Sequence, residues 1–342
     1  MSNFKDLNGA SCYVIAEAGL NHNGSIEIAK KLIDLAHIAG SNAVKFQKRT
    51  VQILAVKDTL YAKDNRFPEF GSTYKEIREH LEFTFEQYQE LKEYTENKNM
   101  DFIVTGFDIE AIDFLIKLKV KSIKLASHSL TNTELLDYVS SKKIPVILST
   151  GMADFEEIDK AVEIFKSKNS PLSLLHCVSS YPTPTKDCNL SMIQVLKERY
   201  GLQTGYSGHE LGYLPSLVAV SKGAEIIERH YTLDNDMIGF DHKMSLSPQQ
   251  FIEMVKLIRD IDDVLGNGKK TILEAEWITR NKYHVSMVSK KTIKTGELLT
   301  KDLVEYKNPG TGIPHKDSDK IYGKIAVKDI PKDTLLSYEM FK

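Results

Sequence analysis

The chain has 342 residues, 42% of them apolar and 27% charged, which is long enough for one large domain and a small one. Its formal net charge is −2, with lysines and acids mixed along the chain, so composition gives no reason to expect a nucleic acid or a membrane surface as partner. The cysteines Cys12, Cys177 and Cys188 lack Cys-x-x-Cys spacing and favour a reducing compartment. No apolar stretch is long enough for a signal or membrane helix, so we expect a cytoplasmic protein.

Short apolar, β-branched runs alternate along the chain with longer segments of helical periodicity. The expected strands are Cys12–Ala16, Ala43–Phe46, Phe102–Thr105, Ser122–Leu125, Pro145–Ser149, Leu172–Cys177, Gln203–Tyr206 and Glu225–Glu228. The expected helices include Ile26–Ala39, Phe85–Lys98, Ala111–Leu118, Glu134–Ser141, Phe155–Lys166 and Leu190–Glu198. About eight such units predict an α/β fold, a (β/α)8 TIM barrel.

Two segments depart from this alternation. The stretch Val51–Leu81 is too long for an ordinary turn and is predicted to cover an active site, as long loops of such barrels usually do. After Gly266 the pattern changes to short strands and turns, such as Val285–Ser289 and Leu303–Tyr306. We therefore predict a barrel domain over residues 1–265, a linker over 266–283 and a small β-rich domain over 284–342. The small domain is near the lower size limit for folding alone, so we expect it to pack on the barrel or on a partner subunit.

Two histidines each fall just past an apolar run, His209 in Gly-Tyr-Ser-Gly-His-Glu and His230 in Ile-Ile-Glu-Arg-His-Tyr. Catalytic residues of such barrels come from the carboxyl ends of different strands, so both would face one site. One such histidine alone is more often a hydrogen-bonded core or loop residue, but the pair at successive strand ends favours a ligand role. Two neutral imidazoles suit a divalent transition metal and leave positions open for water and substrate.

Two lysines, Lys45 and Lys124, stand at the ends of otherwise apolar strands. A buried ammonium without an anion is costly, so an anionic ligand is the natural partner. Glu17, beside a glycine-containing turn, is placed to act as acid or base. The hydroxyls available to complete a phosphate or carboxylate pocket are those of Ser127, Ser149, Thr150, Ser179, Ser180 and Ser207. Any single one of these residues would fit the start of an ordinary loop, but together they indicate an enzyme.

Several motifs together resemble the sialic acid (nonulosonate) synthases. They are Ile-Ala-Glu-Ala-Gly-Leu-Asn-His-Asn-Gly from Ile15, Val-Lys-Phe-Gln from Val44, Leu-Ser-Thr-Gly-Met from Leu148, Leu-His-Cys-Val-Ser-Ser-Tyr-Pro-Thr-Pro from Leu175, Gly-Tyr-Ser-Gly-His-Glu from Gly205, Glu-Arg-His-Tyr-Thr-Leu-Asp from Glu228 and Asp-His-Lys-Met-Ser-Leu from Asp241. The C-terminal segments Ile293-Lys-Thr-Gly-Glu and Pro309-Gly-Thr-Gly-Ile are similar to the antifreeze-like (SAF, β-clip) domain of that family. The resemblance spans nearly the whole chain.

The resemblance implies a transferase that condenses phosphoenolpyruvate with an open-chain N-acyl hexosamine, commonly N-acetylmannosamine, to give a nine-carbon 2-keto acid and phosphate. It implies that His209 and His230 hold Mn²⁺ or Mg²⁺, which polarises the sugar aldehyde, and that Glu17 handles protons. The residues it assigns to phosphoenolpyruvate are Lys45, Gln47, Thr105, Lys124, Ser127, Thr150, Ser179 and Ser207. Those it assigns to the sugar are Tyr181, Asp241 and Asn308.

The chain departs from the family pattern at three positions. Ser129 stands where the family has an acid, and Phe240 where proline is frequent. Asn308, after Lys307, stands where many members carry a basic residue that reaches into the partner's site, so a domain-swapped homodimer is expected if either residue serves a neighbouring barrel. These departures leave the acceptor open among N-acetylmannosamine, its 6-phosphate and a diacetamido sugar that leads to a legionaminic-type product. A non-catalytic sugar-binding homologue stays an alternative, while the C-terminal domain argues against a synthase of keto-octonate type.

Overall fold

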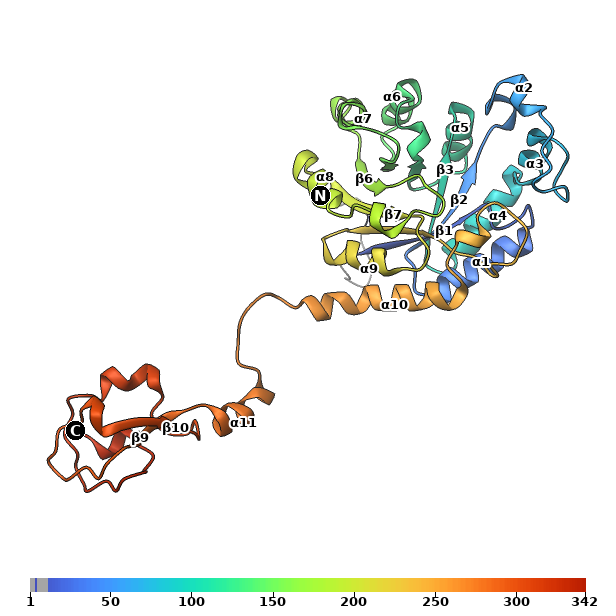
Figure 1. Ribbon diagram of the computed structural model, residues 1–342. Coiled ribbons are helices and arrows are strands. Elements are labelled where there is room, and N and C mark those ends of the chain that lie inside the picture. Colours follow the sequence, from blue (N-terminus) through green and yellow to red (C-terminus); the bar gives the residue numbers. More distant parts are fainter. Residues whose placement is uncertain (1–3, 5–11) are drawn as a thin grey trace. The chain divides into compact units, whose positions relative to one another are not determined.

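The computed structural model describes Phe4 and residues 12–342, and the chain divides into two compact units, Met1–Gly266 and Asn267–Lys342. The first unit is a closed barrel of eight parallel strands, in which β1 pairs with both β2 and β8 (Figure 1). The strands are β1 (Tyr13–Gly19), β2 (Ala43–Lys48), β3 (Asp101–Gly106), β4 (Ile123–Leu125), β5 (Val146–Ser149), β6 (Leu172–Cys177), β7 (Gln203–Gly208) and β8 (Ile226–His230). The predicted TIM barrel is confirmed.

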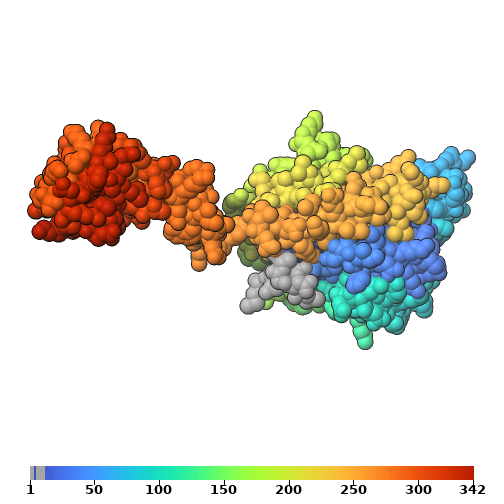
Figure 2. All heavy atoms as spheres, turned by 90° about the horizontal axis from the view of Figure 1, so that it is seen from below, coloured from blue at the N-terminus to red at the C-terminus, as the bar shows by residue number. Residues whose placement is uncertain are grey.

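Helices surround this barrel on its outside (Figure 1). They are α1 (Ile26–Ile38), α4 (Phe85–Glu96), α5 (Ile109–Lys117), α6 (Thr133–Ser141), α7 (Phe155–Ser167), α8 (Met192–Tyr200), α9 (Leu214–Ser221) and α10 (Pro248–Leu265). Two further helices, α2 (Lys57–Leu60) and α3 (Tyr74–His80), belong to the segment between β2 and α4. The start of α10 is fixed by a capping box, because Ser247 and Gln250 each accept the other's backbone N–H. Helix α10 then packs against α9, and Figure 2 shows it in orange along one flank of the barrel.

The strands β1, β7 and β8 run two or three residues further than the apolar runs predicted. The parallel ladder continues through polar residues, since Glu17 pairs in register with His230, and Ser207 with Glu228. The barrel interior is open to solvent at this end, so a polar side chain there does not need to leave the sheet. Glu17, Ser207 and His230 are therefore strand residues and not the first residues of loops.

The barrel interior changes from apolar to polar within one step along the strands. One buried apolar layer contains Ile15, Ala43, Ile103, Ile147, Leu175 and Ile226. The residues two positions further along the same strands are Glu17, Lys45, Thr105, Ser149, Cys177 and Glu228. Residues i and i+2 of a strand face the same side of the sheet, so the second set also points into the barrel. The apolar layer thus closes the barrel beneath a polar chamber.

The stretch Val51–Leu81 contains a short 3₁₀ turn, α2 and α3. Its aromatic residues Phe67 and Phe70 pack with a small buried cluster that includes Leu20 and Ile77. Arg78 of α3 lines the chamber described below. This segment therefore forms part of the chamber wall.

The second unit consists of α11 (Glu274–Tyr283) and a small β structure, in which β9 (Ser286–Ser289) pairs antiparallel with β10 (Val304–Lys307). Isolated bridges such as Ile293 to Ile330 add further pairing. Its separate core is formed by Met287, Ile293, Leu299, Leu303, Val304, Ile313, Ile321, Ala326, Ile330, Leu336 and Phe341. The β-rich C-terminal fold is confirmed. Within the part of the chain that the structure describes, no helix is both long and apolar enough to cross a membrane.

Candidate active site

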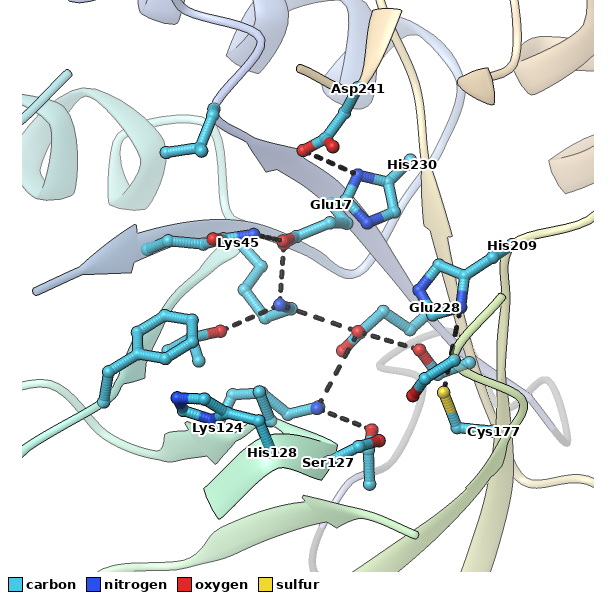
Figure 3. A pocket seen from close by; sticks show the side chains of 18 of the residues that line it. Glu17, Lys45, Lys124, Ser127, His128, Cys177, His209, Glu228, His230 and Asp241 are labelled. Carbon is cyan, nitrogen blue, oxygen red and sulfur yellow. Dashed lines mark hydrogen bonds and ion pairs between the residues drawn. The ribbon is translucent and has the colours of Figure 1, made fainter. Parts of the chain in front are cut away.

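A cavity of about 290 Å³ opens at the carboxyl ends of the barrel strands (Figure 3). It is lined by most of the residues that the sequence singled out, although they are spread over more than 220 positions of the chain. Those residues are Glu17, Lys45, Gln47, Thr105, Lys124, Ser127, Ser149, Ser179, Tyr181, Ser207, His209, His230 and Asp241. A chamber of this size and polarity fits small polar ligands.

Glu17 and Lys45 form a buried ion pair, with 2.7 Å between Lys45 Nζ and Glu17 Oε2. Gln47 Nε2 donates to the other carboxylate oxygen of Glu17 at 2.6 Å, and Lys45 Nζ also donates to Thr105 Oγ1 at 2.9 Å. Burial by itself would lower the pKa of Lys45, but the carboxylates of Glu17 and Glu228 outweigh this effect and raise it. Lys45 is therefore charged in the ligand-free chamber.

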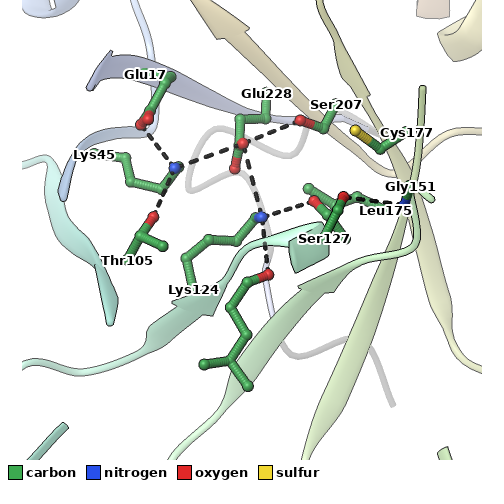
Figure 4. A network of polar contacts seen from close by, with 12 residues as sticks. Glu17, Lys45, Thr105, Lys124, Ser127, Gly151, Leu175, Cys177, Ser207 and Glu228 are labelled. Atoms are coloured by element: carbon green, nitrogen blue, oxygen red, sulfur yellow. Dashed lines mark hydrogen bonds and ion pairs between the residues drawn. The ribbon is translucent and has the colours of Figure 1, made fainter. Parts of the chain in front are cut away.

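Glu228 joins the two lysines, and sequence reasoning did not select it (Figure 4). Its Oε1 lies 3.6 Å from Lys45 Nζ and 3.9 Å from Lys124 Nζ, and it accepts a hydrogen bond from Ser207 Oγ at 3.1 Å. Burial would raise the pKa of this carboxyl group, but Lys124 and Lys45 lower it below its usual value. The sequence places Glu228 at the end of an apolar run. Residues two apart on a strand face the same side, so the spacing Ile226, Glu228, His230 could have indicated that Glu228 faces the chamber.

Lys124 donates to Ser149 Oγ at 2.7 Å and to the Leu125 carbonyl oxygen at 3.1 Å. Burial is the main reason that its pKa is lowered, and the nearby Lys45 adds to the effect. The two lysines together face two carboxylates, so the protein itself supplies the anions that the sequence argument attributed to a ligand alone. An incoming anion would meet hydrogen-bond donors already held in place.

His209 and His230 lie with their ring centroids 5.6 Å apart. His209 Nδ1 is 3.1 Å from the Val178 carbonyl oxygen, which assigns the proton to Nδ1 and leaves Nε2 as an acceptor. Burial, followed by the neighbouring His230, lowers the pKa of His209 to about 3, so this ring is neutral at physiological pH. Neutral imidazole is the form that binds a metal.

His230 has a buried Nδ1 that forms no hydrogen bond with any described residue, and Asp241 Oδ2 lies 3.8 Å away from it. Within the described part of the chain, no group of three or more His, Cys, Asp or Glu side chains is arranged to hold a metal ion. The two imidazoles and the unsatisfied nitrogen fit a cation that takes its remaining ligands from water or substrate. Tyr181 borders this side of the chamber, with its ring centroid 4.2 Å from that of His209.

Thr150 does not line the chamber. Its hydroxyl donates to the Leu175 carbonyl oxygen at 3.1 Å, and its neighbour Ser149 lines the chamber instead. The reason is strand parity, because Ile147 and Ser149 face inward and the next residue must face outward. The placement of Thr150 in the phosphate pocket is therefore corrected to Ser149.

The structure shows the contacts around Ser129 and Asn308, two of the positions where the chain departs from the family pattern. Ser129 is buried, and its hydroxyl lies 2.9 Å from Nδ1 of His128, which lines the chamber. Asn308 belongs to the second unit and is exposed, and the Lys307 ammonium beside it is paired with Glu305 at 2.8 Å and Asp333 at 2.6 Å. In this structure Lys307 is thus held by carboxylates of its own domain.

Comparisons with known proteins show which family this chain resembles. The NeuB family model matches residues 32–270 and the SAF domain model matches residues 284–342. The N,N'-diacetyllegionaminic acid synthase of Legionella pneumophila is 37% identical over 337 residues, which cover 96% of this chain and 94% of that protein. The N-acetylneuraminate-9-phosphate synthase of Homo sapiens is 33% identical over 331 residues, covering 96% of this chain and 92% of that protein.

A solved structure extends the likeness to three dimensions. The N-acetylneuraminic acid synthetase of Leptospira borgpetersenii superimposes with a TM-score of 0.68 and 38% sequence identity, covering 78% of this chain and 90% of that chain. The resemblance drawn from the sequence motifs is confirmed. This chain belongs to the NeuB family.

Proposed function

We propose that this enzyme condenses phosphoenolpyruvate with an open-chain N-acyl hexosamine to give a nine-carbon 2-keto acid and phosphate. The observation that carries the proposal is the position of Glu17, which pairs in register with Lys45 on one side and with His230 on the other. Glu17 therefore lies between Lys45, which can donate hydrogen bonds to an anion, and the histidine pair, which would hold the metal that binds the aldehyde. The relatives named above are synthases of N,N'-diacetyllegionaminic acid and of N-acetylneuraminate 9-phosphate, which supports this substrate class.

In the proposed reaction, the phosphate and carboxylate of phosphoenolpyruvate accept hydrogen bonds from the two lysines and the chamber hydroxyls. C3 of phosphoenolpyruvate forms a bond to the aldehyde carbon, and the aldehyde oxygen takes up a proton from solvent water. Water then adds to the cationic C2 and loses a proton to Glu17. Cleavage of the bond between C2 and the phosphate oxygen leaves the keto group and inorganic phosphate.

His209 and His230 would hold a divalent cation, Mn²⁺ or Mg²⁺, which when bound supplies Lewis-acid polarisation of the aldehyde. The Val178 carbonyl fixes the ring tautomer of His209, and Asp241 faces His230 from the sugar side. These contacts orient the two rings toward the same part of the chamber before any ligand arrives.

The test is phosphate release measured with each component omitted in turn. We expect release only with phosphoenolpyruvate, an N-acyl hexosamine and a divalent metal together, and a product mass equal to the two substrates plus water minus phosphoric acid. Glu17→Gln and His230→Ala should abolish it, and intact turnover in both would overturn the roles assigned here. Calorimetric binding of the sugar with no phosphate release under any metal would instead identify a non-catalytic homologue.

We propose further that the working unit is a cytoplasmic homodimer in which the segment around Asn308 serves the chamber of the partner subunit. This rests on the family resemblance of the C-terminal domain. Light scattering of the full chain, combined with activity across a dilution series, tests it. A fully active monomer would refute the dimer.

A further inference from the structure

Two arginines, Arg49 and Arg78, also line the chamber and take no part in the reaction proposed above. Arg49 follows β2, and only 9% of its surface is exposed. Its Nη2 donates to Gln47 Oε1 at 2.6 Å, its Cζ lies 3.8 Å from the ring centroid of Phe107, and its Nη1 is buried with no hydrogen-bond partner. The carboxylate of Glu82 is engaged by the Arg49 backbone N–H and by Lys48, not by the guanidinium.

Arg78 reaches the same chamber from α3 in the long β2–α4 segment. Its Cζ lies 4.4 Å from the ring centroid of Phe240, and its Nε is buried with no hydrogen-bond partner. Neither Arg49 nor Arg78 forms an ion pair with any residue that the structure describes. By contrast, Arg66 stacks on the same Phe240 ring at 5.1 Å but is paired with Asp64 at 2.6 Å.

Arg49 and Arg78 each have a buried guanidinium N–H group that could donate to a ligand in the chamber. Burial, followed by the proximity of Arg78, lowers the pKa of Arg49 to about 10, so the Arg49 guanidinium still carries its charge at neutral pH. Buried donors and like charges without partners are costly in a folded protein. A planar guanidinium suits phosphate oxygens, which accept two parallel hydrogen bonds from it.

The surroundings of Arg78 lie on the sugar side. Phe240, which Arg78 contacts, directly precedes Asp241, and Asp241 lies 3.8 Å from His230. Burial and Arg78 lower the pKa of Arg49, and Glu82, Tyr88 and, last, Asp241 oppose this effect. Phosphoenolpyruvate already has its own donors in Lys45, Lys124 and the hydroxyls around them, so a second anion site in the same chamber is left for the other substrate.

Building on the proposed function, we infer that Arg49 and Arg78 bind a phosphomonoester at the end of the acceptor remote from its aldehyde. The preferred acceptor is then a phosphorylated N-acyl hexosamine, and the product keeps that phosphate while the phosphate of phosphoenolpyruvate is released. The ester bond of the acceptor takes no part in the reaction. Arg49 and Arg78 act as specificity residues.

The test compares N-acetylmannosamine with its 6-phosphate in the phosphate-release assay with the full chain. Wild-type protein should show kcat/KM at least about tenfold higher for the phosphorylated acceptor, the effect of one hydrogen bond to a charged group. Arg78→Gln should raise the KM for that acceptor at least about tenfold and leave the KM for phosphoenolpyruvate unchanged. Arg78→Lys should restore part of the loss, and Arg66→Gln, on the same aromatic ring, should have no effect.

Three outcomes would overturn the inference. A raised KM for phosphoenolpyruvate in Arg78→Gln would assign the arginines to that substrate. Equal use of both acceptors by wild type would leave the proposed function intact and remove the phosphate subsite. Absence of phosphate release with every acceptor would contradict the proposed function. In that case, calorimetry would still test the phosphate subsite, because equal binding of the two sugars to the wild-type protein would refute it.

Discussion

Glu17 and Lys45 face each other across β1 and β2 as register partners, and their charged ends are 2.7 Å apart inside the barrel. Both side chains are almost completely buried. The pair lies directly above an apolar layer, and its burial keeps both charges out of contact with bulk water. Its integrity should affect stability as well as catalysis.

Replacing Lys45 with methionine should destabilise the protein by about 3–5 kcal/mol, because it leaves buried carboxylates unpaired. Urea unfolding monitored by circular dichroism measures the change in the free energy of unfolding. The matched control is Lys30→Met, which breaks an ion pair with Glu90 at the surface and should change stability little. Equal effects of the two substitutions would show that the buried pair is not a stability element.

Glu228→Gln should lower the rate of phosphate release at least about tenfold, because both lysines lose a shared carboxylate. Ser207→Ala removes only one hydrogen bond to Glu228 and should have a smaller effect. Steady-state rates of the two variants, with circular dichroism to verify folding, provide the comparison. A larger loss in Ser207→Ala would mean that the hydroxyl, and not the carboxylate, matters.

Thr150→Val should leave the KM for phosphoenolpyruvate unchanged and lower stability by about 1 kcal/mol, since it removes a hydrogen bond to the Leu175 carbonyl. Ser149→Ala should raise that KM, because its hydroxyl lines the chamber beside Lys124. Kinetics and urea unfolding of both variants separate the two roles. The reverse result would restore Thr150 to the phosphate pocket.

Mn²⁺ should stabilise the wild-type protein by about 2.7 kcal/mol at a concentration one hundred times its dissociation constant. His230→Ala should lose this stabilisation, while His37→Ala, an exposed residue of α1, should keep it. Thermal unfolding with and without the metal measures the difference independently of turnover. Undiminished stabilisation in His230→Ala would place the metal elsewhere.

Acid should destabilise the protein partly through His22. Burial, helped by the nearby His242, lowers the pKa of this ring from 6.5 to about 3. Between these two pKa values the unfolded chain binds more protons than the folded one. The contribution of the neutral His22 ring to stability is therefore complete above pH 6.5 and is lost as the pH falls below it. Uptake of one such proton on unfolding lowers the free energy of unfolding by about 2 kcal/mol between pH 6.5 and pH 5.

Urea unfolding at these two pH values should show a smaller difference for His22→Asn than for wild type. The exposed His37→Asn should behave like wild type. An unchanged pH dependence in His22→Asn would mean that His22 is not responsible for the acid sensitivity.

The barrel was predictable because its signal is local. A buried parallel strand reads as a short apolar run, and the helix that follows has its own period, so the repeated units are visible without any contact information. The polar residues that end these runs were also visible, and they gave Glu17, Lys45, Lys124 and the two histidines. The choice of Thr150 over Ser149, and the omission of Glu228, came from treating strand ends as loop starts when the alternation of inward and outward residues continued through them.

The sequence by itself determined the fold, the family and most of the polar chamber, because these depend on periodicity and on short motifs at strand ends. Only the tertiary structure showed that Glu228 joins both lysines and that Arg49 and Arg78 form no ion pair with a carboxylate of the described residues. Arg78 and Phe240 are distant in sequence and meet only when the long segment after β2 packs over the barrel mouth. The charge environment of a group depends on such non-local neighbours, and no local pattern encodes it.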